Sequence, residues 1–376
     1  MRTINHEGLL AEVCAAIEKS PWAAVDCEAD SLHHYVEKLC LLQVSIPGED
    51  YVIDPLVPLD LSSLAHQLSK KSLILHGADF DIRILNRFYG FKPTEVFDTM
   101  IAAQLLGYEK QGLADLALKH CGITLSKKAQ RADWSERPLD DELIDYAAKD
   151  THYLKRISDN MKAELVGLGR LEWLKQCCER LIIATTRSDE KKAEREHPWQ
   201  IKGSKELSAR SLAILKTLWH WREEEARRRD RPSFKVLHAE VMVHIAKWAA
   251  ENHGKDVTLL PGAPRNVKGE HRDSLNRLVK EGWSAPPLRY MEVKKVFKGK
   301  RPDENSKKRL ATLKEVRQQI AAELKIQPGV LVTNAGLEAV ALEAPKSLEA
   351  IKGMGFFMPW QVDVLGVPFL KIVTGP

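Results

Sequence analysis

Short apolar runs alternate with stretches of helical periodicity over the first 160 residues of the chain. Apolar runs bounded by turn residues predict five strands, at 23–28, 39–46, 51–54, 72–76 and 95–98. The turn chemistry of residues 47–50 predicts that the second and third strands form a hairpin. Apolar positions at helical spacing predict helices at about 59–70, 79–89, 99–107, 112–121 and 140–160. This order is typical of an α/β fold, a mixed sheet with helices on its faces.

The strand pattern fades from about residue 163, and two similar helical stretches follow. The first begins with a helix at 208–229, for which Ser208 is the expected N-cap. Apolar stripes mark the long helix of each stretch: Leu212, Leu215 and Trp219 in the first, and Leu310, Leu313, Ile320 and Leu324 in the second. After each long helix a proline-led segment, 232–237 or 328–331, precedes another helix. The pattern predicts two copies of one small helical module with one linker, 283–304, between them. The charged run 188–198 before the first copy reads as a linker or an exposed helix end.

Composition places the chain among soluble globular proteins of two or three domains. It has 376 residues, of which 44% are hydrophobic and 29% charged, and this balance excludes a disordered or collagen-like chain. No apolar run approaches the ~20 residues of a membrane helix, and the first residues lack the pattern of a secretory signal. We therefore expect a cytoplasmic protein. Its six cysteines form no CxxC pair, which favours reduced thiols over a disulfide or zinc site.

Charge is divided unevenly along the chain. Residues 1–150 carry 15 Lys and Arg against 24 Asp and Glu, whereas residues 151–376 carry 42 against 28. The acidic part could hold metal ions and the basic part could hold a polyanion such as nucleic acid. Solvated lysine-rich helices explain the second half equally well.

Five residues at the edges of predicted elements carry the candidate chemistry. Asp26 and Glu28 are two apart on the first strand, so their carboxylates share one face of it. Asp81 opens the helix after the fourth strand. Tyr146 and Asp150 are four apart on a late helix, where they are neighbours on one face.

Such a carboxylate cluster indicates a metal site. Carboxylates held close together at neutral pH require a cation, and hard oxygen ligands suit Mg²⁺ or Mn²⁺. Two such ions about 4 Å apart can activate water and stabilise a leaving oxygen in an attack on phosphorus. Asp79 is an alternative to Asp81 as the ligand of the second motif. Asp98 is expected as a helix N-cap, and His76 as a packed strand-end residue.

The order of these five residues resembles the tyrosine-bearing subgroup of the DEDD superfamily of 3′–5′ exonucleases. VDCEADSLHHYVEKLCLLQVS, LHGADFDIRIL and DWSERPLDDELIDYAAKDTHYL are similar to the three exonuclease motifs of the ribonuclease D family. IKGSKELSARSLAILKTLWHWREEEARRRDRP resembles its first helicase-and-RNase-D C-terminal (HRDC) domain, and 305–376 resembles a divergent second copy. One departure is Gly77, where the superfamily often has asparagine.

The resemblance implies an RNase H-like exonuclease domain at 1–190 and two all-α HRDC domains, at 200–282 and 305–376, with a basic linker at 283–304. By position it makes Asp26, Glu28, Asp81 and Asp150 the ligands of two Mg²⁺ or Mn²⁺ ions. Tyr146 would orient the attacking water, because a phenol of ordinary pKa near 10 is a poor base at neutral pH.

The implied activity is 3′–5′ exoribonuclease trimming of structured RNA such as tRNA precursors, with release of nucleoside 5′-monophosphates. We expect a monomer that needs neither a membrane nor an organic cofactor. A DNA exonuclease or a catalytically dead binding scaffold remains an alternative, because the same carboxylates cut either polymer and the 2′-hydroxyl discriminates.

Six further residues are candidates for contact with the substrate: His34, Arg131, Trp134, Arg137, Arg227 and Arg228. Trp134 could stack on a base or cap the core, since buried aromatic residues and stacking platforms look alike in sequence. Arg131 and Arg137 could contact phosphates. The arginine run at 227–229 could grip the RNA backbone or satisfy the last carbonyls of its helix.

Overall fold

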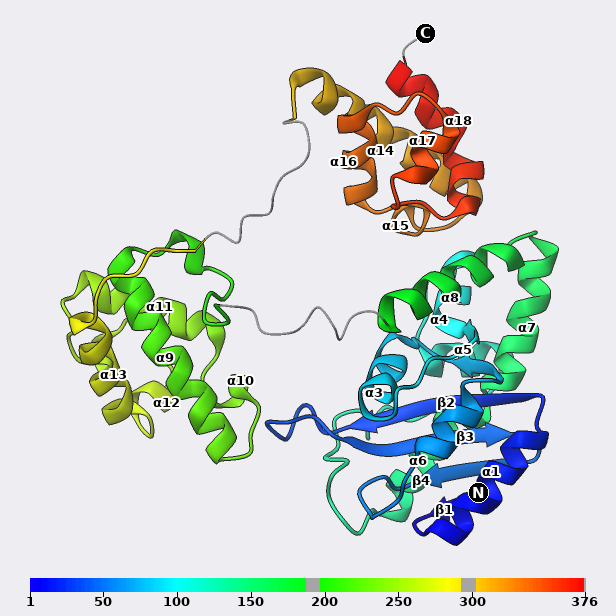
Figure 1. Ribbon diagram of the computed structural model, residues 1–376, viewed down its shortest axis with the longest axis horizontal. Helices are drawn as coiled ribbons and strands as arrows, with labels where there is room; N and C mark the ends of the chain where they lie inside the picture. The colour runs from blue at the N-terminus through cyan, green and yellow to red at the C-terminus, as the bar shows by residue number, and fades with distance from the viewer. Residues whose placement is uncertain (187–196, 292–301, 375–376) are drawn as a thin grey trace. The chain divides into compact units, whose positions relative to one another are not determined.

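A six-stranded mixed sheet forms the centre of the N-terminal part of the computed structural model, which describes residues 1–186, 197–291 and 302–374 (Figure 1). The strands lie in the order β1-β4-β3-β2-β5-β6. Their bounds are β1 Arg2–Ile4, β2 Trp22–Ala29, β3 Leu39–Ile46, β4 Glu49–Ile53, β5 Ser72–Leu75 and β6 Glu95–Asp98. β3 is antiparallel to β2 and β4, which confirms the predicted hairpin, whereas β5 runs parallel to β2 and β6.

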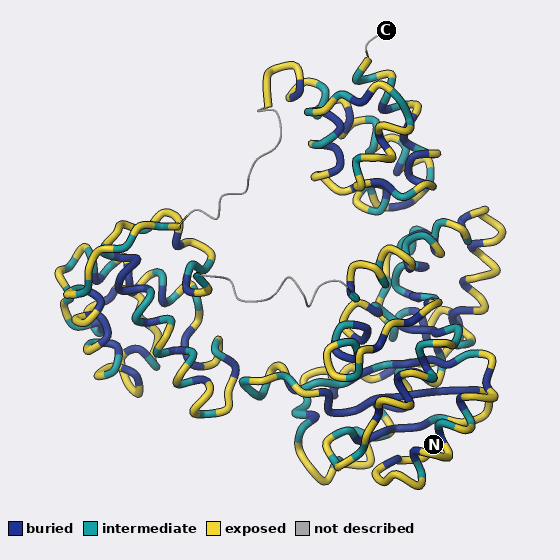
Figure 2. Tube along the Cα trace, in the orientation of Figure 1, coloured by how far each residue is buried: buried dark blue, intermediate teal, exposed yellow. Residues whose placement is uncertain are grey.

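Eight helices accompany this sheet in the described residues before 187: α1 Glu7–Lys19, α2 Ser62–Leu68, α3 Asp79–Tyr89, α4 Thr99–Leu106, α5 Leu113–Cys121, α6 Asp141–His152, α7 Leu154–Gly167 and α8 Leu171–Thr186. α6 packs on β2, β3 and β4, and α8 packs on α3 and β6. All eight residues of β3 are buried because both faces of the sheet are covered (Figure 2). An α/β fold is therefore confirmed.

Two features differ from the sequence prediction. No element was predicted before residue 20, yet β1 pairs with β4 at the sheet edge and α1 follows it. β1 has only three residues, which is too short for a periodicity to stand out. The helix predicted at 140–160 is two helices, α6 and α7, although neither glycine nor proline marks the break at Tyr153.

Residues 197–291 form the first helical module, which groups with the segment 30–38 into one compact unit. Its elements are η2 Ser204–Glu206, α9 Ala209–Arg228, α10 Ser233–Val236, α11 Ala239–Glu251, η3 Val257–Leu259, α12 Arg265–Lys268 and α13 Arg272–Ser284. The Ser208 side chain accepts a hydrogen bond from Ser211 N, which confirms the predicted N-cap.

Residues 302–374 form the C-terminal helical module, which groups with the sheet and its helices into the other unit. Its helices are α14 Glu304–Leu324, α15 Pro328–Leu331, α16 Asn334–Glu343, α17 Leu348–Gly353 and α18 Pro359–Thr374. As in the first module, a long helix is followed by a one-turn helix and then by a helix of intermediate length. Both predicted linkers fall partly on residues 187–196 and 292–301, outside the described part.

Arg170 and Trp173 connect the C-terminal module to the sheet domain. The Arg170 guanidinium donates to the Leu105 carbonyl at 2.7 Å and to the Leu324 carbonyl at 2.8 Å. Trp173 stacks on Trp360 with ring centroids 4.3 Å apart. The two parts therefore share one hydrophobic core within this unit. No helix in the described ranges is long and apolar enough to cross a membrane.

Candidate active site

β2 carries the first two acidic residues of the site, Asp26 and Glu28. Successive strand residues alternate in direction, so the side chains two apart share a face while Cys27 between them points to the other. Carboxylate oxygens of Asp26, Glu28 and Asp150 all lie within 4.8 Å of one another. We call these three residues the acidic cluster. The predicted convergence of residues far apart in the chain is thus present in the structure.

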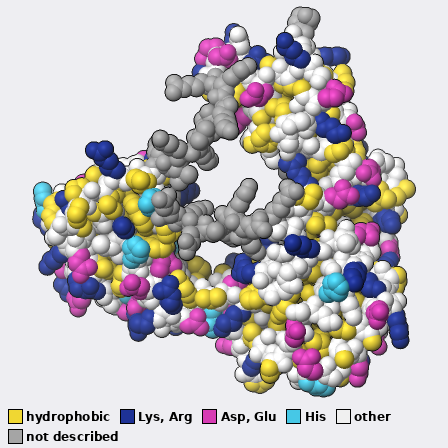
Figure 3. All heavy atoms as spheres, viewed as in Figure 1, with side chains coloured by type: hydrophobic (Ala, Val, Ile, Leu, Met, Phe, Trp, Pro, Cys, Tyr) yellow, Lys and Arg dark blue, Asp and Glu magenta, His cyan; other side chains and the backbone are white. Residues whose placement is uncertain are grey.

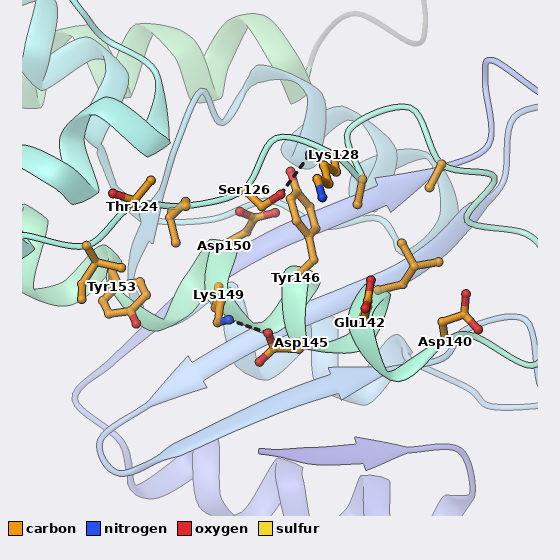
Figure 4. A pocket seen from close by; sticks show the side chains of 15 residues that line it. Thr124, Ser126, Lys128, Asp140, Glu142, Asp145, Tyr146, Lys149, Asp150 and Tyr153 are labelled. Atoms are coloured by element: carbon orange, nitrogen blue, oxygen red, sulfur yellow. Dashed lines mark hydrogen bonds and ion pairs between the residues drawn. The ribbon is translucent and has the colours of Figure 1, made fainter.

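α6 brings Tyr146 and Asp150 to the cluster. The helix begins after Asp140 and packs on the sheet face that presents Asp26 and Glu28. Because four residues make about one helical turn, Tyr146 and Asp150 lie one above the other. Figure 4 shows both side chains on the same side of α6. The phenol can therefore reach a molecule that the carboxylates hold.

Asp81, in the first turn of α3, is buried beside the acidic cluster without belonging to the 4.8 Å group. Its carboxylate accepts a hydrogen bond from the Cys27 thiol and lies close enough to Asp26 to raise its own pKa. Asp79 points outward and forms an ion pair with Arg83 at 2.7 Å. Of the two candidates, the structure therefore favours Asp81 as the ligand.

Asp98 caps α4 and also fixes the turn that leads into α3. Its carboxylate oxygens accept hydrogen bonds from the backbone N–H groups of Met100 and Ile101, as the predicted N-cap requires, and from those of Gly77 and Ala78. Gly77 has a φ of +72°, and a Cβ there would lie 3.0 Å from Met100 Cε. Glycine thus suits a turn that asparagine often occupies in the superfamily.

Burial and mutual repulsion perturb the carboxyl groups of the cluster. Burial, chiefly, raises the pKa of Asp26 to about 7. Burial and the charges of Asp26 and Asp150 raise the pKa of Glu28 to about 9. Burial and Asp26 raise the pKa of Asp150 to about 8. Such shifts are expected for carboxylates that converge without a cation.

The donor set fits hard divalent cations. Three carboxylates converge, and in the described part of the chain none of the three forms an ion pair with Lys or Arg. Oxygen ligands of this kind match the preference of Mg²⁺ and Mn²⁺. Bound cations would favour the ionised carboxylates and so offset the burial, and for Glu28 and Asp150 also the neighbouring charges, that raise these pKa values.

Tyr146 remains a phenol in this environment. Burial and the charges of Asp150 and Glu28 raise its pKa. Trp134 packs against its ring with centroids 6.1 Å apart and is only 2% exposed. Of the two predicted alternatives for Trp134, the structure favours a core residue over a substrate contact, because a buried ring offers no face to a base.

A cavity of about 570 Å³ adjoins Tyr146 and Asp150 (Figure 4). Thr124, Ser126 and Lys128 line its opposite wall. Sequence reasoning did not single out these residues, although hydroxyl and basic side chains cluster in 124–131. The volume is in the range of small-molecule sites, and the lining mixes apolar side chains with hydroxyl, lysine and carboxylate groups.

Arg137 and Arg131, both expected to contact the substrate, lie in different surroundings. The Arg137 guanidinium binds both carboxylate oxygens of Asp54 at 2.7 Å and the Cys40 carbonyl at 2.9 Å, so it fixes the segment after Trp134. Arg131 is exposed and directly precedes Ala132, which lines the cavity. These contacts favour a structural role for Arg137.

The remaining candidates lie in the unit of the first helical module. His34 pairs with Asp230 at 2.7 Å, and the Arg227 guanidinium lies 5.2 Å from the centre of the Tyr35 ring. Arg228 pairs with Glu225 at 2.7 Å. On the face shown in Figure 3, Lys and Arg side chains lie among Asp and Glu rather than in one basic field.

Comparisons with known proteins agree with this geometry. The family described as 3′-5′ exonuclease matches residues 1–166, and the family described as HRDC domain matches both 211–253 and 306–373. Two separate matches to one family confirm the predicted repeat of a helical module.

Two relatives and one solved structure illustrate the likeness. A ribonuclease D from Sphingobium indicum is 38% identical over 248 residues, 65% of this chain and 63% of that protein. A ribonuclease D from Jannaschia sp. is 30% identical over 390 aligned positions, 99% of this chain and 95% of that protein. The crystal structure of Escherichia coli RNase D covers 99% of this chain and 98% of its own, with a TM-score of 0.69 and 21% identity, and shares the fold.

Proposed function

The chain belongs to the ribonuclease D family of metal-dependent 3′–5′ exoribonucleases, and we propose that it trims the 3′ ends of structured RNAs, such as tRNA precursors, with two divalent cations. The observation that carries this proposal is the convergence of Asp26, Glu28 and Asp150 within 4.8 Å beside Tyr146. Nucleoside 5′-monophosphates are the expected products.

Asp26, Glu28, Asp81 and Asp150 are the proposed ligands of two Mg²⁺ or Mn²⁺ ions. When bound, such ions lower the pKa of an attacking water and stabilise the charge on the leaving oxygen. The acidic cluster, together with Asp81 on α3, would hold the ions beside the terminal phosphodiester. The raised pKa of Tyr146 keeps its hydroxyl protonated, so Tyr146 donates a hydrogen bond that orients the water.

The cavity beside Tyr146 is the proposed place of the terminal nucleotide. Lys128, together with exposed Arg131, supplies positive charge near this wall for the RNA phosphates. The first helical module would hold the body of the RNA, with Arg227 and Arg228 on its long helix as candidate backbone contacts. We further propose that the enzyme acts as a monomer in the cytoplasm.

A 5′-labelled RNA with a short 3′ tail, incubated with the protein and Mn²⁺, tests the proposal. We expect stepwise shortening with release of nucleoside 5′-monophosphates. Asp26→Ala and Asp150→Asn should lower the rate at least about 100-fold, since each removes a proposed ligand. Asp79→Asn is the matched control, because Asp79 faces outward toward Arg83 and should be dispensable.

Two outcomes would contradict the proposal: no monophosphate release by the wild-type protein, or full activity of both ligand variants. The same tail made of DNA tests the polymer preference. Slower digestion of DNA than of RNA is expected if the 2′-hydroxyl is recognised.

A further inference from the structure

Gln43 is a buried amide without a protein partner in the middle of β3. Its side chain is 0% exposed, and neither Oε1 nor Nε2 forms a hydrogen bond with any described residue. A buried primary amide can donate two hydrogen bonds and accept two, and leaving it unpaired is unfavourable. Buried polar groups without a partner are rare in native proteins, and those that occur commonly have a functional role or bind a water or an ion.

The sheet register places Gln43 beside the acidic cluster. Gln43 pairs directly with Asp26 across β2 and β3, and with Val52 across β3 and β4. Residues directly opposite in an antiparallel pair point to the same face, with Cβ atoms about 4.5–5.5 Å apart. The amide therefore lies on the face that carries Asp26, within reach of its carboxylate.

α6 covers the amide from above. It packs on β2, β3 and β4 and crosses these strands in Figure 4. The residues that it buries there include Ala147 and Ala148, which pack in one cluster with Leu41 of β3 and Val52 of β4. One turn separates Ala147 from Asp150 in the sequence of this helix. Gln43 is thus enclosed by the strand and the helix that supply the cluster.

Ser45, a second polar residue on the same face of β3, does form hydrogen bonds. It lies two residues further along β3, opposite Ala24. Its hydroxyl bonds to the Asp50 carboxylate at 2.6 Å and to the Thr151 hydroxyl at 2.7 Å. Polar residues beneath α6 can therefore find hydrogen-bond partners. The nearest polar group across the strand pair from Gln43 is the carboxylate of Asp26, and we take it as the missing partner.

We infer that Gln43 is a positioning residue for the metal ligands, and that its amide donates a hydrogen bond to the Asp26 carboxylate when that carboxylate binds a divalent cation. This inference rests on the proposed function. One carboxylate oxygen can face the cation while the other accepts the amide N–H, which fixes the orientation of the ligand.

The neutrality of the amide suits this position. A lysine or arginine opposite Asp26 would pair with the carboxylate and repel a divalent cation. A glutamine donates to the carboxylate and leaves its charge available to the ion. An apolar residue at the same point of β3 would leave one oxygen of the half-buried carboxylate without this donor.

Gln43→Met tests the inference in the full chain, because methionine has a similar shape and no amide. Titration calorimetry with Mn²⁺ should show an affinity about 10- to 100-fold weaker than that of the wild type, the range observed for groups that orient metal ligands. The melting temperature of the metal-free variant should stay the same or rise, because an unpaired buried amide is removed. Exonuclease activity should recover when Mn²⁺ is raised in proportion.

Ser45→Ala is the matched control on the same strand face. It removes two hydrogen bonds that the fold uses, so its melting temperature should fall while its Mn²⁺ affinity stays unchanged. Gln43→Asn keeps an amide on a shorter side chain. It should bind Mn²⁺ more weakly than the wild type even if Gln43→Met does not fold.

The outcomes separate this inference from the proposed function. A wild-type protein that binds no Mn²⁺ overturns both. A wild-type protein that binds Mn²⁺ and loses it on Asp26→Asn, while Gln43→Met and Gln43→Asn bind it with wild-type affinity, overturns the role of Gln43 alone.

Discussion

Substitution of Arg170 by methionine should weaken the packing of the C-terminal helical module on the sheet domain and so lower the stability of the protein. Arg170 is 7% exposed, and its guanidinium donates to Leu105 O at the end of α4 and to Leu324 O at the end of α14. Both carbonyls belong to helix C-termini, which leave their last carbonyls without partners inside the helix. One cation therefore satisfies two helix ends that come from different parts of the chain.

The magnitude follows from these two contacts. A hydrogen bond from a charged donor contributes about 1.5–3 kcal/mol, and burial, which lowers the pKa of Arg170, offsets part of the gain. Arg170→Met keeps an aliphatic stem over Trp173 but leaves two carbonyls unpaired. We expect a loss of about 3 kcal/mol, which corresponds to a melting temperature lower by roughly 6–12 °C for a domain of about 150–250 residues.

Thermal unfolding followed by circular dichroism measures this loss. Arg180→Met is the matched control, because Arg180 also donates to a carbonyl of the C-terminal module, that of Phe356 at 3.0 Å, but is exposed. Its loss should be within about 1 kcal/mol. Equal melting temperatures for wild type and Arg170→Met would refute the reasoning, and so would an equally large effect of Arg180→Met.

Three further predictions concern the interface and the site. Gly107→Ala should lower the melting temperature more than Gly122→Ala. Both glycines have a positive φ, but only at Gly107 would a Cβ meet a backbone atom, Lys325 O at 1.9 Å, so similar melting temperatures for the two variants would argue against the contact. Tyr146→Phe should lower kcat about 100-fold with unchanged Mn²⁺ affinity, since it removes one hydrogen-bond donor from the transition state; an unchanged kcat would exclude the role. In EDTA the melting temperature should fall as pH rises from about 5 to 9, and Mn²⁺ should abolish the slope. The reason is that carboxyl pKa values raised to about 7, 8 and 9 in the folded state exceed the ~4 of the unfolded chain, so the folded state binds more protons in this window. A flat profile in EDTA would show that the fold does not raise the pKa values of these carboxyl groups.

Local periodicity made most of the fold predictable. β3 coincides with the predicted strand 39–46, and α9 starts after its predicted cap. The acidic cluster was also within reach, because spacings of two on a strand and four on a helix each fix a shared face. That β2 and α6 then meet depends on tertiary packing, and here the resemblance of the motifs to a known family supplied what spacing alone could not.

The sequence did not predict the roles of polar residues whose hydrogen-bond partners lie far away along the chain. Arg170 binds carbonyls 65 and 154 positions away, and Arg137 binds a carboxylate 83 positions away. Nothing local distinguishes such an arginine from one that faces solvent or phosphate. Trp134 shows the same ambiguity for an aromatic ring, which only burial resolves.

Gln43 illustrates why the buried polar residue is the more informative exception. In the run LCLLQVSI it is one of two polar residues, with Ser45, that interrupt a buried strand, and this by itself suggests only an edge or a slip in register. The structure places it in the interior, opposite Asp26 and without a hydrogen-bond partner among the residues that the structure describes. Burial and the neighbouring charges raise the pKa of Glu28, and the amide beside the cluster has no partner in the described part of the chain, so two unfavourable features of the fold meet at one point. A bound divalent cation would neutralise the carboxylates, and it would keep one Asp26 oxygen ionised so that it can accept a hydrogen bond from the amide. Metal binding should therefore stabilise this protein by more than a site of carboxylates alone would.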